Sequence, residues 1–212
     1  MTTAPGTPLL IACALGIERL ALRSGDRRGA PGPVTVLRTG MGPEAAASAT
    51  TRVLGEAPAR DTAVIASGFC AGLLSGMHPG DLIVAEETRG GGGTTACVGI
   101  EVLAKALAAA LPGRTVHTGP LTGSDHVVRG HEQAELRDTG AIAVDMESAA
   151  TLWSAVRTGS RPVAAVRVVV DAPEHELVSI GTVRGGISAF RVLRAVLPAF
   201  YEWHRSLLLP RR

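Results

Sequence analysis

The fold class is decided by the stretch Val163-Ala164-Ala165-Val166-Arg167-Val168-Val169-Val170-Asp171. Its apolar residues do not alternate with polar ones, which is typical of a strand that is buried on both faces of a sheet. Similar short runs of Val, Ile, Leu and Ala occur at 9–14, 34–37, 63–66, 82–85 and 141–144. These runs predict a largely parallel or mixed sheet between two layers of helices.

Helix-like stretches separate the apolar runs. They span 44–54 after Pro43, 101–111 before Pro112, 147–157 behind Asp145 as a helix cap, and 186–208 as the longest. The glycine run Gly90 to Gly93 is expected to be a flexible loop. Strands that alternate with helices predict an α/β fold, here a three-layer αβα sandwich with a mixed central sheet. We treat residues 1–212 as one domain, because this length is ordinary for a single domain.

Composition excludes several classes of protein. The net charge of +2 does not favour a nucleic-acid binder. Three cysteines without C-x-x-C spacing and six scattered histidines argue against a disulfide scaffold and against a metal site. We see neither a basic start typical of a signal peptide nor an apolar run of about 18 residues. The expectation is therefore a cytoplasmic protein without a membrane span.

Two glycine turns follow predicted strands. Met41 and Gly42 open a helix, and the segment Ser67-Gly68-Phe69-Cys70 follows the run at 63–66. Small residues at the carboxyl end of a strand allow a ligand to approach the backbone. A tight turn between strand and helix explains the first segment equally well. We interpret Cys70 as a small buried hydrophobe, since no His and acid accompany it.

Three acids stand where apolar strands end. Asp145 and Glu147 flank Met146 at the start of a predicted helix, and Asp171 ends the longest apolar run. Ligands of α/β sheets bind outside the carboxyl ends of the strands. Desolvation beside valines should also raise the pKa of Asp171 and let it hold a proton. Helix capping by Asp145 and Asp171, and a favourable helix dipole for Glu147, remain the alternative interpretation.

Taken together, these motifs resemble the purine nucleoside phosphorylase and nucleosidase superfamily. The likeness includes Glu18 after the first strand, the turn at Met41, the loop at Gly68, the segment Gly123-Ser124-Asp125, the tetrad at Glu147 and the strand that ends at Asp171, in this order. The methylthioadenosine/S-adenosylhomocysteine nucleosidases are the well-known relatives. The chain is most similar to the hopanoid-associated phosphorylases, which are held to release adenine from adenosylhopane.

The resemblance implies a role for each acid. Glu147 would hold the ribose hydroxyls above Met146, Asp171 would protonate the purine, and Glu18 would position the attacking water. These roles suit a reaction in which the sugar becomes positive and the base negative. The pocket is expected to include the following further residues: Met41, Gly42, Ser67, Gly68, Phe69, Asp145 and, in place of a base-stacking Phe, His126.

The implied reaction is cleavage of the N-glycosidic bond of a 5′-substituted adenosine. Adenosylhopane is the preferred substrate, and methylthioadenosine with S-adenosylhomocysteine, or futalosine, are alternatives. Ala66 stands where hexameric phosphorylases have a phosphate-binding Arg, which favours water, whereas the hopanoid resemblance favours inorganic phosphate as co-substrate. No other cofactor is expected, and the nucleophile stays open.

Val170 stands where the superfamily usually has Ser, so Asp171 is held differently or is desolvated more strongly. This departure would also fit a nucleoside sensor without catalysis, which stays an alternative of another class. An NAD-binding module is disfavoured because no G-x-G-x-x-G opens the first helix. Relatives are dimers to hexamers, which implies a homo-oligomer.

The C-terminal segment holds four of the six aromatics of the chain. Phe190, Leu193, Leu197 and Phe200 recur at helical spacing, which core packing explains most simply. Tyr201 and the segment from Trp203 to Arg212 combine Trp, Leu and Arg as membrane-interface segments do. We therefore expect this tail to form an apolar mouth of the pocket and to touch the membrane transiently.

Overall fold

The computed structural model describes residues 6–56, 62–172 and 181–208, without the side chains of 181–187. Within these ranges the strands are β1 (Leu9–Cys13), β2 (Val34–Arg38), β3 (Ala63–Gly72), β4 (Leu82–Gly90), β5 (Gly93–Ala96), β6 (Val116–Gly123), β7 (Ala143–Asp145) and β8 (Val163–Asp171). The helices there are α1 (Gly16–Ser24), α2 (Pro43–Glu56), α3 (Ile100–Ala110), α4 (His131–Asp138), α5 (Ser148–Arg157), α6 (Gly181–Ala195) and α7 (Leu197–Leu208).

One mixed sheet joins these strands. β1 lies between β2 and β3, and all three are parallel. β8 lies between β3, to which it is parallel, and β4, to which it is antiparallel. β4 also pairs with β5 and β6, and β7 joins β6 to the end of β3. The path from β3 through β8, β4, β6 and β7 thus returns to β3, so this part of the sheet closes on itself.

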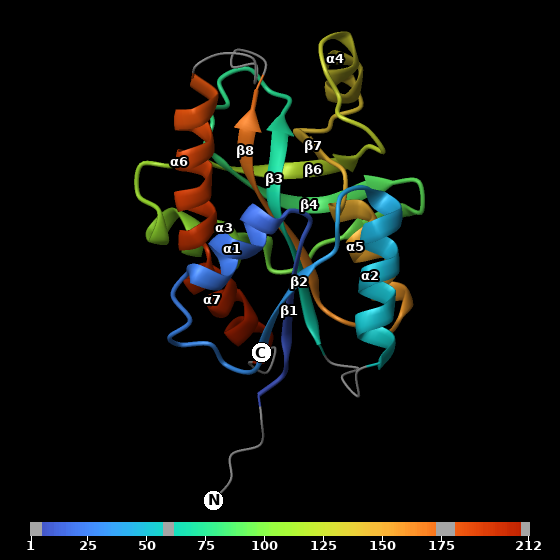
Figure 1. Ribbon diagram of the computed structural model, residues 1–212, viewed down its shortest axis with the longest axis vertical. Helices are drawn as coiled ribbons and strands as arrows, with labels where there is room; N and C mark the ends of the chain where they lie inside the picture. Colours follow the sequence, from blue (N-terminus) through green and yellow to red (C-terminus); the bar gives the residue numbers. More distant parts are fainter. Residues whose placement is uncertain (1–5, 57–61, 173–180, 209–212) are drawn as a thin grey trace, which may run out of the picture.

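Helices cover both faces of the sheet. α1, α3, α6 and α7 contribute to one apolar cluster, and α2 and α5 contribute to the other. Figure 1 shows α6, α1 and α7 on the left of the strands and α2 and α5 on the right. The predicted three-layer αβα sandwich is therefore confirmed. The strands at 9–14, 34–37, 63–66, 82–85, 141–144 and 163–170 all occur, with β3 and β4 longer than expected.

Several local expectations need correction. The glycine run at 90–93 is the turn of a hairpin in which Gly90 pairs with Gly93. The helix expected at 186–208 is two helices, since Pro198 cannot lie inside a helix but suits the first turn of α7. β6 was not predicted because Gly119 and Pro120 interrupt its pattern, and α4 buries no residue that would give a periodic signal. The short helix α1 and strand β5 were missed as well.

The C-terminal helix lies far from the predicted mouth. His204 and Leu208 line a hollow with Ala63 and Pro162, at the amino ends of β3 and β8. The expectation of an apolar mouth is therefore wrong for residues 204–208, and 209–212 lie outside the described residues. Trp203 is buried and donates from Nε1 to the Val98 carbonyl oxygen over 2.8 Å, and Tyr201 is buried too.

The expected core packing of this segment is confirmed. Leu193, Leu197 and Phe200 are buried in the cluster on the α1 face, and Phe190 packs against it. Over the described residues, no helix combines the length and the hydropathy that crossing a bilayer requires.

Candidate functional site

A cavity opens where the parallel strands β1, β3 and β8 end. It has a volume of about 180 Å³, and strand-end residues of β3, β7 and β8 face it. Eight of its described lining residues were predicted for the site from the sequence: Glu18, Met41, Phe69, Asp145, Met146, Glu147, His126 and Asp171. The fold thus brings together acids that are up to 153 positions apart in the sequence, from Glu18 to Asp171.

Glu18 lies in the first turn of α1 and is buried. Its Oε2 accepts hydrogen bonds from the amides of Ala14 and Leu15 over 2.9 and 2.8 Å. Its Oε1 accepts one from the amide of Phe69 over 2.7 Å. These bonds cap the helix and stabilise a carboxylate at a defined place in the cavity.

Arg167 is the buried cation of the site. It lies in β8 with its side chain only 1% exposed, and its Nη2 forms an ion pair with Asp145 Oδ2 over 2.6 Å. Its Nε donates to Ser148 Oγ over 2.9 Å. Burial disfavours the charge of Arg167, but Asp145, Glu147 and Glu18 together raise the pKa of the guanidinium. A buried charge of this kind needs such partners.

Asp145 binds two groups, the guanidinium of Arg167 and the backbone amide of Ser148. Besides Arg167, it accepts the amide of Ser148 at both carboxylate oxygens over 3.2 Å, and Ser148 begins α5. Glu147, not Asp145 as predicted, stands at the N-cap position of α5, although Asp145 accepts the amide of the first helical residue. Asp145 thus orients Arg167; because it also lines the cavity, its contact with a substrate stays a prediction.

Glu147 connects two walls of the cavity. Its Oε1 accepts the amide of Gly42 over 2.9 Å, and Oε2 lies 4.0 Å from Arg167 Nη1. Gly42 has a φ of +92°, which glycine adopts readily. Burial raises the pKa of the Glu147 carboxyl, against the opposing effects of Arg167 and the Gly42 amide. The carboxylate therefore stands at the cavity wall and is held by the turn that precedes α2.

Only glycine fits at position 68, because the side chains of Glu18 and Arg167 leave no room for a Cβ. Its φ is +151°, and a Cβ there would collide with Glu18 Oε1 and lie 2.6 Å from Arg167 Nη1. These two atoms thus approach the same point from opposite sides. Among the described residues, Arg167 Nη1 has no hydrogen-bond acceptor. The gap left by the glycine is therefore a place where a small polar molecule could meet a carboxylate and a guanidinium.

Asp171 ends β8 and is 8% exposed. Gln133 of α4 donates from Nε2 toward its Oδ2 over 3.5 Å and toward the Val128 carbonyl over 3.4 Å. The structure thus places Asp171 in the cavity wall, and proton transfer from it to a bound base stays a prediction. Gln133 was not predicted, because α4 carries no periodic signal in the sequence.

The remaining predicted site residues differ in how deeply they are buried and in whether they line the cavity. Phe69 and Met146 are partly buried in the wall, whereas Met41 is 65% exposed at the mouth. His126 is exposed, and hydrogen bonds to Asp125 and Glu132 raise its pKa. Ser67 is fully buried in β3 and does not face the cavity. Stacking of His126 on a base stays a prediction.

The sequence profile of the phosphorylase superfamily matches residues 29–198 of this chain. The chain belongs to the phosphorylase superfamily. This membership confirms the expectation of an enzyme that cleaves an N-glycosyl bond. No protein of curated function matches the chain by sequence.

Bacterial nucleosidases are among the solved structures that have the same fold as this chain. The 5′-methylthioadenosine/S-adenosylhomocysteine nucleosidase of Neisseria meningitidis, in complex with methylthio-immucillin-A, is 22% identical with a TM-score of 0.78 over 92% of this chain and 99% of its own. The S-adenosylhomocysteine nucleosidase of Streptococcus pyogenes, with 5-methylthiotubericidin, is 19% identical with a TM-score of 0.76 over 95% and 98%. At these identities the likeness establishes the fold alone.

A larger hollow of about 590 Å³ adjoins the site of this superfamily member. It shares Met146 and lies between α2, α5 and the β4–β5 hairpin, with Trp153 in its wall. Glu18, Glu147 and Asp171 do not line it. Of the two cavities, only the smaller one is lined by these three acids.

Arg167 is the functional residue that sequence analysis missed. Its signal was present, since a lone arginine inside the apolar run at 163–170 needs a buried acid as partner. The sequence could not name that partner, because Asp145 precedes Arg167 by a complete helix and loop. Cys70, as expected, is buried in the wall, and burial raises the pKa of its thiol.

Proposed function

We propose that this protein cleaves the N-glycosidic bond of a 5′-substituted adenosine and releases adenine. One observation carries the proposal: Glu18 of α1, Glu147 just before α5 and Asp171 of β8 line the same small cavity. Departure of the base leaves positive charge on the sugar and negative charge on the purine. Two carboxylates on the sugar side and one proton donor at the base would oppose these two charges.

We assign a role to each residue on this basis. Glu147, held by the Gly42 amide, would accept the ribose hydroxyls. Asp171 would donate a proton to the departing purine. Glu18 Oε1 would orient the nucleophile, and Arg167 Nη1, which lies near the same space beside Gly68, would balance the charge of Glu18. Such prepositioned groups act without reorganising during the reaction.

Water is the nucleophile that this site favours. No Arg or Lys is among the described residues that line the cavity, and three carboxylates surround Arg167. This excess of negative charge opposes a phosphate dianion but suits a water that donates to Glu18. Among 5′ groups, the methylthio and homocysteine groups have the support of the solved neighbours. The exposed Met41 and Val127 at the mouth favour the larger apolar group of adenosylhopane.

Adenine release tests the proposal directly. The protein should release adenine from methylthioadenosine at the same rate with and without inorganic phosphate, and mass spectrometry should find the free sugar. Release that depends on phosphate, with a sugar 1-phosphate as product, would exclude water as the nucleophile. If no 5′-substituted adenosine yields adenine, the protein is a sensor rather than an enzyme.

Glu147→Gln should lower kcat/KM about 10- to 100-fold, the worth of a hydrogen bond to a charged group. Wild type should discriminate against a 2′-deoxy substrate by a similar factor, whereas the variant should treat both substrates nearly alike. Glu202→Gln, an exposed glutamate of α7, is the matched control and should leave both rates unchanged. A variant that still discriminates against the 2′-deoxy substrate as wild type does would remove Glu147 from the ribose.

A further inference from the structure

The mouth of the cavity is unusually apolar. The described residues include five exposed large hydrophobic side chains, and two of them, Met41 (65%) and Val127 (57%), also line the cavity. Two others, Ile17 (53%) and Leu20 (60%), lie on α1 beside Glu18. The fifth, Leu208, lies at the opposite end of the sheet. Four of the five thus belong to segments that line the cavity, and exposed apolar side chains that gather in one region, rather than scatter, mark an interaction site.

Helix α1 has the pattern of an interfacial helix. Its buried face carries Glu18, Ala21 and Leu22, whereas Ile17 and Leu20 stand on its outer face. Arg19 and Arg23, one turn apart, flank these two residues and are exposed. Apolar residues next to arginines on one helical face suit the boundary between headgroups and acyl chains. The outer face of α1, with Met41 and Val127, is here called the mouth face.

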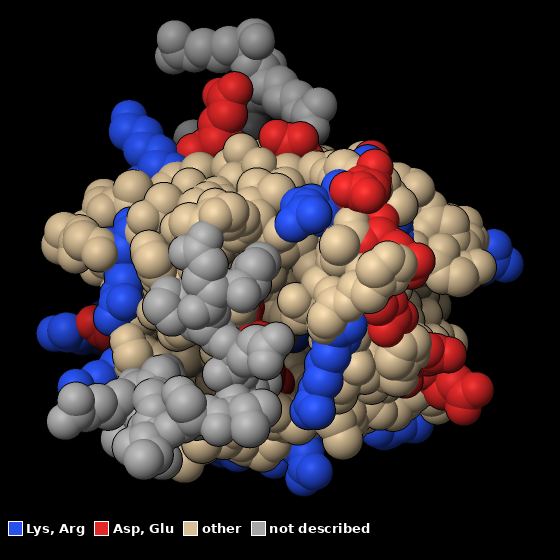
Figure 2. Space-filling view, turned by 90° about the horizontal axis from the view of Figure 1, so that it is seen from above, with Lys and Arg blue, Asp and Glu red and all other residues tan. Residues whose placement is uncertain are grey.

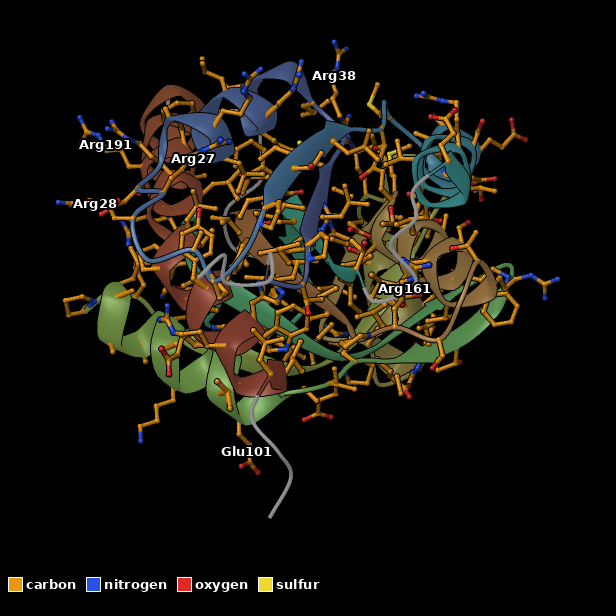
Figure 3. The ribbon with its side chains drawn as sticks, turned by 90° about the horizontal axis from the view of Figure 1, so that it is seen from below. Arg27, Arg28, Arg38, Glu101, Arg161 and Arg191 are labelled. Carbon is orange, nitrogen blue, oxygen red and sulfur yellow. The ribbon has the colours of Figure 1, made fainter. Side chains whose placement is uncertain are left out.

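A basic surface continues from the mouth face. Exposed arginines follow in the loop after α1, at the end of β2 and on α6, which packs against α1. They are Arg27, Arg28, Arg38, Arg191 and Arg194. Arg28, Arg38 and Arg191 point away from the body of the molecule in Figure 3. The one exposed acid described on α1 and its following loop is Asp26, which Arg28 already pairs over 2.7 Å.

The acidic side chains lie elsewhere on the same end of the molecule. Figure 2 looks down on this end, where most acidic side chains gather on the right, whereas basic ones stand on the left edge and also at the centre, bottom and right. The left side is that of α6 and α1 in Figure 1. On the side of α1 and α6 the exposed arginines therefore outnumber the exposed acids among the described residues. Such a surface complements a negatively charged layer that also accepts apolar side chains.

The cavity is small compared with the ligand that such a mouth would admit. Its volume of about 180 Å³ is below the roughly 300–1,000 Å³ of pockets that enclose drug-sized ligands. A nucleoside can use it only with part of its structure outside. A bulky 5′ group would then remain at the mouth, beside Met41 and Val127.

We propose that the mouth face docks on an anionic lipid bilayer, so that a nucleoside with a lipid-like 5′ group enters the cavity from the membrane. Ile17, Leu20 and Met41 would enter the interface, and the arginines would contact lipid phosphates. The assignment of the substrate class rests on the proposed function, whereas the docking surface itself does not. The chain would bind from outside and reversibly, by apolar area and charge together.

Vesicle sedimentation tests the docking surface. Wild type should bind vesicles of phosphatidylcholine mixed with phosphatidylglycerol, should not bind vesicles of phosphatidylcholine alone, and should be released by high salt. Leu20→Gln should weaken binding about tenfold, since it removes an apolar side chain that the bilayer would bury. Arg23→Gln should weaken it about fivefold, as expected for one cation near an anionic surface. Neither residue contacts the reacting groups.

Matched controls are available at the far side. Leu208→Gln and Arg52→Gln remove an exposed leucine and an exposed arginine from α7 and α2 and should not change vesicle binding. Equal losses in these controls, or equal binding to both kinds of vesicle, would overturn the proposal. If Leu20→Gln instead lowers the mass in analytical ultracentrifugation without affecting vesicle binding, the mouth face contacts a second copy.

Adenine release from soluble methylthioadenosine separates the two proposals. The Leu20 and Arg23 variants should keep the wild-type rate on this substrate. If the wild-type protein releases adenine but does not bind vesicles, the docking proposal is wrong and the proposed function stands. Vesicle binding by a protein that releases no adenine would overturn the proposed function and, with it, the lipid-linked substrate.

Discussion

Asp171→Asn is expected to lower kcat about 10²- to 10⁴-fold, the usual worth of general acid catalysis. The asparagine has nearly the same shape and can still accept from Gln133, but its side chain cannot give a proton to the departing purine. The measurement is adenine release under saturating substrate, with circular dichroism to show that the fold is intact. Asp138→Asn, an exposed residue of α4, is the control.

A second substrate makes this test specific. A riboside whose leaving group is already acidic, such as para-nitrophenyl riboside, needs little protonation. The Asp171 variant should therefore cleave it at close to the wild-type rate. An equal loss on both substrates would mean that Asp171 shapes the cavity rather than donates the proton. A variant that keeps more than about a tenth of kcat on the adenosine substrate would remove Asp171 from catalysis.

Asp145→Ala is expected to lower the free energy of unfolding by about 3–5 kcal/mol. The change leaves the guanidinium of Arg167 buried without its closest anion, which lies 2.6 Å away in the wild type. It also removes the acceptor of the Ser148 amide at the start of α5. Urea unfolding followed by circular dichroism measures the loss.

An exposed ion pair provides the control for this prediction. Glu202→Ala breaks the pair of Glu202 and Arg205 on α7 and should cost less than about 1 kcal/mol, because solvent screens that pair. The double variant Asp145→Leu with Arg167→Met should recover most of the stability, since it leaves no unpaired charge. A cost for Asp145→Ala no larger than that for Glu202→Ala would show that Arg167 does not depend on this partner.

Features that depend on near neighbours in the chain could be predicted. The apolar run at 163–170 was recognised as a buried strand, and Asp171 was placed at its end, because burial on both faces requires unbroken apolar residues. A helix start close to Asp145 was also predicted, and Asp145 accepts the first amide of α5, although Glu147 takes the N-cap position. The strands of the sandwich were found in the same way. Strand β6 and helix α4 were missed, since Pro120 and the polar surface of α4 give no periodic signal.

The partners of the site residues depended on distant parts of the chain. Glu18 meets the amide of Phe69 at a separation of 51 residues, and Glu147 meets Gly42 at 105. Nothing in the local pattern around Glu147 indicates Gly42 as the group that holds it. The place of the C-terminal tail was mispredicted for the same reason. Its Trp and Leu are typical of a membrane interface, but Trp203 is buried and donates to the carbonyl oxygen of Val98.

The sequence by itself determined the kinds of element in this protein and the acids that stand at their ends, because these follow from periodicity and burial over a few residues. Only the tertiary structure decided that β8 lies between β3 and β4, and this pairing buries Arg167 beside Asp145. It also decided that Glu18 of α1 is buried beside the cavity whereas Leu20 of the same helix is exposed. The physical reason is that strand pairing and helix docking are selected by the whole buried surface, which no local stretch of residues contains.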